Sequence, residues 1–164
     1  MPVLERLRLD HGPALLAFEQ ENRAYFAASV SDRGDDYFRD FDARHRSSLA
    51  EQAAGVCHLH LIVDGDGSIA GRINLFEVAD GSASLGYRIA ERATGRGLAT
   101  AAVNQVLAIA ATDYELTELR ASATLDNVGS QTVLNRTGFV PIGETTIRGR
   151  PATQFVRRLG QCRG

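Results

Sequence analysis

Apolar and polar residues follow regular periods along most of the chain, and these periods predict its elements. Residues 4–9 alternate apolar and charged side chains, which indicates a half-buried strand. Apolar residues then recur at helical spacing in two segments, from about residue 13 to 28 and from residue 37 to 55. Two helices are therefore expected before the main body of a sheet.

The middle of the chain has the pattern of an antiparallel meander. Strand patterns cover residues 57–64, 68–78 and 82–89, and short turns rich in aspartate and glycine separate them. Because glycine and aspartate tolerate the positive φ of hairpin turns, consecutive strands are expected to pair antiparallel.

The last third of the chain alternates helices with strands. We predict an alanine-rich helix over residues 98–113, a strand over 117–125, a short helix over 127–137 and a final hairpin of strands over 139–147 and 152–159. The whole pattern predicts a mixed α/β fold in one domain, residues 1–164. Its largely antiparallel sheet has about seven strands and about four flanking helices, one of which crosses between parallel neighbours.

Composition restricts the chemistry more than the fold. All 18 basic residues are arginines, and the absence of lysine excludes Schiff-base and phosphate-loop lysine mechanisms. A net charge of −2 gives no electrostatic reason to expect a nucleic-acid partner. The arginines near the carboxyl terminus are interpreted as a solvated strand face; they are Arg148, Arg150, Arg157 and Arg158.

Cysteine usage and the amino terminus point to a soluble cytoplasmic protein. Cys57 and Cys162 are far apart, which argues against a disulfide framework and for a reducing compartment. Charges appear too early for a signal peptide, and no apolar run reaches membrane-spanning length. We expect no membrane partner.

The segment Cys57-His58-Leu59-His60 places three residues of metal-ligand type close together. In a strand, however, the two histidines share one face while Cys57 points to the other, and no fourth ligand has a recognisable spacing. No metal site is expected.

A glycine loop, residues 92–100, lies between a predicted strand and a predicted helix. Gly95 and Gly97 lack β-carbons, so phosphate oxygens can approach the backbone amides at the positive end of the helix dipole. The dinucleotide fingerprint fits poorly because Thr100 occupies the place of its third small residue, and the ATPase phosphate loop needs a lysine. A tight turn without any ligand explains the two glycines as well.

A downstream pattern decides between these interpretations. Asn127-x-x-Ser130 begins the short helix and Gly138-Phe139 ends it. Together with Arg92-x-x-Gly95-x-Gly97 and with Leu85-Gly86-Tyr87-Arg88-Ile89 before it, this pattern resembles the GNAT N-acyltransferase superfamily. It is most similar to the Rim-type branch, which acetylates ribosomal-protein amino termini. The resemblance implies a sheet splayed between its fourth and fifth strands, with acetyl-coenzyme A bound in the gap.

The resemblance also implies which residues contact the cofactor. Backbone groups of Tyr87, Arg88 and Ile89 would hold the pantetheine arm, and an amide there would stabilise the developing oxyanion. Asn127 matches an asparagine that contacts coenzyme A, although asparagine is also a favoured helix N-cap. The loop would cradle the pyrophosphate, with the two arginines as charge partners, through Arg92, Gly95, Arg96, Gly97, Leu98, Ala99 and Thr100.

Two catalytic roles follow from the resemblance. Ser130 matches the serine proposed to protonate the leaving thiolate, and a packed or solvent-facing helix serine is the alternative. Many other GNAT enzymes carry a tyrosine where this chain has Leu134. Rim-type relatives often have a glutamate where this chain has Ser84, so Glu77, or alternatively Glu144, is the candidate base. A solvated surface carboxylate explains each of these glutamates as well.

The predicted function is acetyl transfer from acetyl-coenzyme A to a primary amine, by direct attack in a ternary complex. The amine is a peptide or protein amino terminus or a small amine. The alternatives are a module that binds or senses acyl-coenzyme A without turnover, and a structural domain with neither ligand nor activity. A homodimer is left open. Aromatic residues of the early helices are predicted to be core, with some lining an acceptor pocket: Tyr25, Phe26, Tyr37, Phe38 and Phe41.

Overall fold

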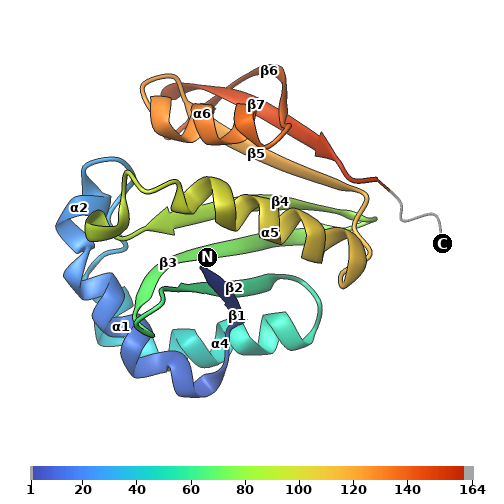
Figure 1. Ribbon diagram of the computed structural model, residues 1–164. Coiled ribbons are helices and arrows are strands. Elements are labelled where there is room, and N and C mark those ends of the chain that lie inside the picture. The colour runs from blue at the N-terminus through green and yellow to red at the C-terminus, as the bar shows by residue number, and fades with distance from the viewer. Residues whose placement is uncertain (1, 161–164) are drawn as a thin grey trace.

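The computed structural model describes residues 2–160; Met1 and residues 161–164, with Cys162 among them, lie outside the described residues. Seven strands form one sheet in the order β1-β2-β3-β4-β5-β7-β6 (Figure 1). The strands are β1 (Val3–Arg6), β2 (His58–Val63), β3 (Ile69–Ala79), β4 (Ser82–Ile89), β5 (Glu118–Thr124), β6 (Val140–Ile147) and β7 (Arg150–Arg158). The helices are α1 (Gly12–Glu21), α2 (Arg23–Ala27), α3 (Asp35–Arg39), α4 (Phe41–Ala53), α5 (Leu98–Thr112) and α6 (Val128–Arg136), with 3-10 turns at Leu9–His11 and Glu91–Ala93.

The sheet is antiparallel except between β4 and β5, which are parallel. These two strands pair only through residues 82–84 and 118–120. Beyond that point they diverge, so that β5, β6, β7 and α6 stand apart from β1 to β4 in Figure 1. The mixed α/β fold and the splay between the fourth and fifth strands are confirmed.

Helix α5 is the crossover that a parallel pair of neighbouring strands requires. Its Ala102, Val103 and Val106 are fully buried against the sheet. The small alanine side chains along this helix bring its backbone close to the sheet, and this fixes the position of the glycine loop at its amino terminus.

The early part of the chain has four helices instead of the two that were expected, because each predicted helix is interrupted. At Asn22 the side chain donates to the Phe18 carbonyl at 2.9 Å and accepts from the Glu91 amide at 3.0 Å. This second bond joins residues far apart in the sequence, so periodicity gives no sign of it. It ties the junction of α1 and α2 to the 3-10 turn that begins just before the glycine loop. The other interruption is at Asp40, between α3 and α4.

The first strand is also shorter than the predicted 4–9 segment, because the chain turns before Leu9. The backbone amide of His11 donates to the Arg8 carbonyl at 3.2 Å and closes a 3-10 turn, and the Arg8 amide donates to His11 Nδ1 at 2.9 Å. Among the helices of residues 2–160, none combines the length and the apolar character needed to cross a membrane.

Candidate active site

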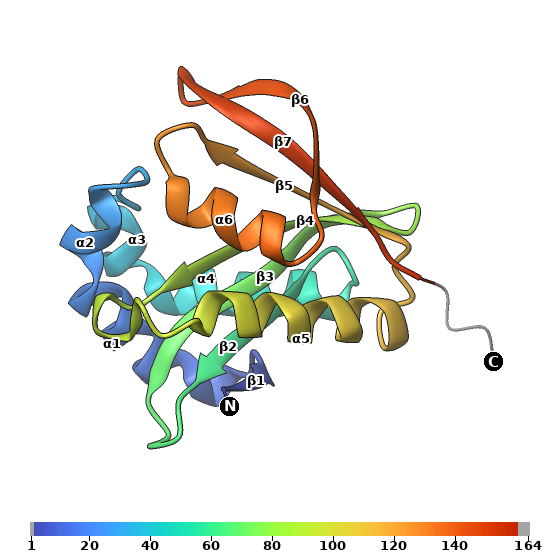
Figure 2. The same cartoon turned by 45° about the horizontal axis from the view of Figure 1, so that its top comes forward.

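A cleft of about 590 Å³ occupies the gap between β4 and β5. Residues 85–89 of β4 line one side, and Ala121 and Ser122 of β5 line the other. Figure 2 shows α5 and α6 flanking the two diverging strands. Because β4 has no strand neighbour along residues 85–89 on this side, its backbone groups are free to bond an extended, amide-containing ligand.

The glycine loop forms one end of this cleft. Gly95 and Gly97 have φ of 78° and 71°, conformations that other residues adopt only with strain. The first intrahelical bond of α5 runs from the Ala101 amide to the Gly97 carbonyl at 3.1 Å. The amides of residues 98–100 therefore have no partner within the helix and lie at the positive end of its dipole. This arrangement suits a pyrophosphate.

Arg92 and Arg96 lie outside the lining of the cleft and bind the β2–β3 turn. Arg92 donates to the Ile69 carbonyl at 2.8 Å, and Arg96 donates to Asp64 at 2.9 Å. The Arg96 hydrogen bond is the main cause of a lowered pKa at Asp64. Both arginines hold the loop against this turn, and a direct role as charge partners of a pyrophosphate stays a prediction.

Tyr87 and Ser130 meet across the cleft. Asn127 Oδ1 accepts from the Ser130 amide at 3.1 Å, which confirms Asn127 as the N-cap of α6. The Tyr87 hydroxyl donates to Ser130 Oγ at 3.3 Å. Burial raises the pKa of Tyr87 more than the bond to Ser130 lowers it. The phenol therefore keeps its proton and can act as a donor.

The Tyr87 side chain is a candidate functional group that the sequence analysis missed, because the resemblance implied only backbone contacts for this residue. Its bond to Ser130 spans 43 positions in the sequence. A contact of that range has no local signal in the sequence. The alternation of side chains along β4 would have indicated only which face of the sheet Tyr87 occupies.

Neither candidate base lines the cleft. Glu77 is exposed in the bulge between Phe76 and Ala79, with φ of 51°, and Glu144 is exposed in the edge strand β6. Among the described residues, the lining of the cleft contains no aspartate, glutamate or histidine. The structure therefore brings the proposed acid into the cleft and leaves both proposed bases outside its lining.

A group of charges lies beside the cleft, on α1, on the segment between α2 and α3 and on the central strands β3 and β4. The carboxylate of Glu19 is 1% exposed and accepts from Arg72 Nη1 at 2.8 Å and from Arg33 Nε at 3.0 Å. Arg88 Nη1 lies 3.6 Å from the same carboxylate. Burial tends to raise the pKa of Glu19, but Arg72 and Arg33 outweigh it and the pKa is lowered, so the carboxylate is charged. We call these four residues the Glu19 cluster.

The aromatic residues of the early helices divide between core and cleft. Phe41 is buried, and Tyr37 packs against the core. Tyr25 and Phe26 line the cleft, and the Arg88 guanidinium lies 5.0 Å from the centre of the Phe26 ring. Part of this aromatic group therefore lines a pocket, and its contact with an acceptor stays a prediction.

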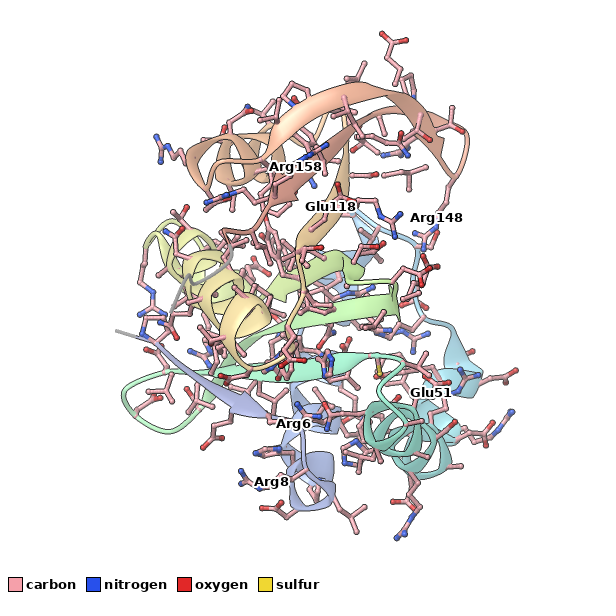
Figure 3. All side chains as sticks on the ribbon, turned by 90° about the vertical axis from the view of Figure 1, so that its right-hand side faces the viewer. Arg6, Arg8, Glu51, Glu118, Arg148 and Arg158 are labelled. Atoms are coloured by element: carbon pink, nitrogen blue, oxygen red, sulfur yellow. The ribbon has the colours of Figure 1, made fainter. Side chains whose placement is uncertain are left out.

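A second cavity of about 360 Å³ adjoins the cleft. The two share Ser29, Val30, Ser122 and Asn127, so they are neighbouring parts of one hollow region. The second cavity reaches the tip of the β6–β7 hairpin, where Figure 3 shows Arg148 beside the segment that joins α2 to α3.

The histidines of β2 are engaged with an aromatic partner. The His58 ring stacks on Tyr114 at 3.6 Å, and His60 Nε2 lies 2.6 Å from the Tyr114 hydroxyl. Within residues 2–160, no three histidine, cysteine, aspartate or glutamate side chains are placed together to hold a metal ion.

Comparison with known proteins places this geometry in a family. The model of the acetyltransferase (GNAT) domain family matches residues 3–140. The protein named "Probable N-acetyltransferase YjcK" of Bacillus subtilis is 28% identical over 130 residues, which cover 76% of this chain and 72% of that protein.

Solved structures share the fold at low sequence identity. Ribosomal-protein-S5-alanine acetyltransferase from Vibrio fischeri superimposes with a TM-score of 0.89 at 17% identity, covering 95% of this chain and 92% of that one. Spermidine N-acetyltransferase from Vibrio cholerae, in complex with coenzyme A and spermine, superimposes with a TM-score of 0.80 at 17% identity, covering 96% and 95%. With its splayed sheet, its glycine loop and the match of the family model over most of its length, the chain belongs to the GNAT acetyltransferase family.

Proposed function

We propose that this protein transfers an acetyl group from acetyl-coenzyme A to a primary amine. One observation carries the proposal: a single cleft has a loop of free backbone amides at one end and the Tyr87–Ser130 pair in its lining. Membership of the GNAT family supports the same reaction class. We further propose a Rim-type enzyme of the cytoplasm, in keeping with the free, buried thiol of Cys57.

The residues present fit coenzyme A. The amides of Leu98, Ala99 and Thr100 would bind the pyrophosphate, and the positive φ of Gly95 and Gly97 shapes the loop that presents them. The unpaired β4 backbone at Tyr87, Arg88 and Ile89 would bond the amides of the pantetheine arm. Asn127 lines the cleft beside Ser130, where it would contact the cofactor while it caps α6.

The bound thioester supplies an activated acetyl group. When the neutral amine attacks the carbonyl carbon, the new C–N bond forms as the C–S bond breaks. A thiol has an ordinary pKa of about 8.5, so the departing sulfur needs only modest help from an acid. Ser130 would give its hydroxyl proton to this sulfur, and Tyr87 would replace that proton through its bond to Ser130 Oγ.

The amine must lose a proton before or during attack. No carboxylate or imidazole occurs in the cleft lining among the described residues, so water in the cleft is the proposed first acceptor of that proton. Glu77 and Glu144 remain candidates for the end of such a water chain. The pH dependence of kcat/KM should then follow the acceptor, whose α-amino group has an ordinary pKa of about 7.7–8.0.

The test is to incubate the protein with acetyl-coenzyme A and a panel of amino-terminal peptides, polyamines and aminoglycosides, and to measure free thiol. Amine-dependent thiol release supports the proposal. A rise in melting temperature with acetyl-coenzyme A but no thiol release would indicate a sensing module. Coenzyme at a hundred times its dissociation constant should add about 2.7 kcal/mol to stability, so the absence of any shift would indicate a structural domain.

A further inference from the structure

The side of the cleft next to α1 and α2 carries an excess of positive charge. In the Glu19 cluster one carboxylate faces the three guanidinium groups of Arg33, Arg72 and Arg88. Both oxygens of Glu19 are already occupied, one by Arg72 and one by Arg33. Two positive charges of this cluster are therefore left without an opposite charge inside it.

Arg88 is the member of the cluster that lines the cleft. Its side chain is 21% exposed, and it makes no hydrogen bond to any residue between 2 and 160. Its distance of 3.6 Å from Glu19 is an ionic contact and is too long for a hydrogen bond. A guanidinium group has five donors and loses free energy when it is removed from water with these donors unused. Arg88 therefore has unused donors that can bind an anionic ligand.

The second cavity continues the same charge pattern. Arg148 and Arg150 line it at the hairpin tip, and no aspartate or glutamate of the described residues lines either cavity. Arg150 has a partner in Asp126, at 3.4 Å, whereas the exposed Arg148 makes no hydrogen bond among residues 2–160. The two adjoining cavities thus carry Arg148 and Arg150 in one and Arg88 in the other.

We propose that the acceptor is an amine that also carries a carboxylate group, which Arg88 binds. Arg148 and Arg150 attract such an acceptor at the mouth of the second cavity. This inference rests on the proposed function and names the substrate class of the same site. A guanidinium group binds a carboxylate through two parallel hydrogen bonds, which fixes orientation as well as charge. The same arginines repel polycations, so polyamines are poor acceptors.

The test compares peptides that differ only in their second residue: aspartate, asparagine or arginine after an amino-terminal serine. Free aspartate and spermidine complete the panel. We expect kcat/KM at least about tenfold higher for the aspartate peptide than for the asparagine peptide, mainly through KM, as for a hydrogen bond to a charged group. If free aspartate is a better substrate than the aspartate peptide, the carboxylate belongs to a small amino acid. If the aspartate peptide is the better substrate, the carboxylate belongs to a peptide side chain.

Variants assign the effect to residues. Arg88→Gln should abolish the preference for aspartate over asparagine, and Arg148→Gln should weaken it. Arg158→Gln is the matched control, because Arg158 lies at the opposite end of the same hairpin and outside both cavities (Figure 3). If Arg88→Gln does not fold, raising the ionic strength with the wild-type protein should reduce the preference instead.

Equal kcat/KM for the three peptides, or a preference for the arginine peptide or spermidine, would overturn the proposal while leaving acetyl transfer intact. Absence of turnover with every amine would instead contradict the proposed function. In that case the carboxylate subsite is still tested by calorimetry, which compares the binding of the aspartate and asparagine peptides. Tighter binding of the aspartate peptide supports the carboxylate subsite, and equal binding contradicts it.

Discussion

The two ends of the cleft are built in different ways. The end proposed for the cofactor, here the cofactor end, consists of backbone: two glycines with positive φ and the free amides that begin α5. The end proposed for the acceptor, here the acceptor end, consists of side chains: Arg88 of the Glu19 cluster lines the cleft, and the hairpin arginines line the second cavity. A backbone site suits the constant pyrophosphate of one cofactor, whereas side chains let the acceptor preference change without disturbing that site.

The difference extends to how each end is stabilised. The loop needs only local conformational freedom and a helix dipole, both of which a short segment provides. The Glu19 cluster needs residues 53 positions apart to meet, as Glu19 and Arg72 do. Glu19 and Arg72 are buried, so the structure around them depends on their pairing. Mutations should therefore have different effects at the two ends.

The largest expected effect is at the acceptor end. Glu19→Gln removes the only carboxylate of the Glu19 cluster and leaves the buried Arg72 guanidinium without its charged partner. Breaking a buried pair in this way costs about 3–5 kcal/mol in the free energy of unfolding, measurable by urea denaturation. Glu21→Gln, on the exposed face of α1, should change stability by no more than about 0.5 kcal/mol. Equal losses for the two variants would show that the cluster does not support the fold.

The next largest effect on stability is expected at His60, a buried side chain away from the cleft. Burial lowers the pKa of His60 to about 4 from its ordinary value near 6.5. The unfolded chain then binds more protons than the folded one between these two values, so stability is full above pH 6.5 and falls as the pH approaches 4. The loss should reach up to about 3 kcal/mol, and His60→Gln should remove this part of the pH dependence. An unchanged pH profile in that variant would refute the assignment to His60.

Between the two ends lies the Tyr87–Ser130 pair. Ser130→Ala removes the proposed acid and should lower kcat about 100-fold, within the usual range for general acid catalysis, with the coenzyme A dissociation constant unchanged. Tyr87→Phe should lower kcat by a smaller factor, because Ser130 remains. Ser82→Ala, in the paired part of β4, is the control and should retain wild-type kcat. Full activity in Ser130→Ala would remove Ser130 from the mechanism.

The smallest effect is expected at the cofactor end. Gly97→Ala must hold a side chain at φ of 71°, at a cost of about 1–2 kcal/mol. Gly149→Ala, at φ of 77° in the β6–β7 turn, should cost a similar amount of stability. Only Gly97→Ala should weaken coenzyme A binding, by about tenfold, as measured by calorimetry. Equal affinity in both variants would argue against the loop as the cofactor site.

The contrast between local and long-range contacts also explains which features of the fold and the site could be predicted from the sequence. Local patterns predicted the β2–β3–β4 meander, the crossover helix, the Asn127 cap and the glycine loop, because each depends on residues close together in the chain. The break at Asn22, the Tyr87–Ser130 bond and the Glu19 cluster all depend on long-range contacts. Arg92 and Arg96 show that a residue within a recognised motif can make contacts that the motif does not indicate. They stand in the motif, yet their side chains bind the β2–β3 turn.

The most direct test of the central claim is to follow the acetyl group itself. Isotopically labelled acetyl-coenzyme A is incubated with the protein and an amino-terminal peptide, and mass spectrometry locates the label. The proposed function predicts one labelled acetyl group on the peptide α-amine, with one free coenzyme A released for each peptide modified. Coenzyme A binding without any labelled peptide or other labelled amine would contradict the claim that this cleft catalyses acetyl transfer.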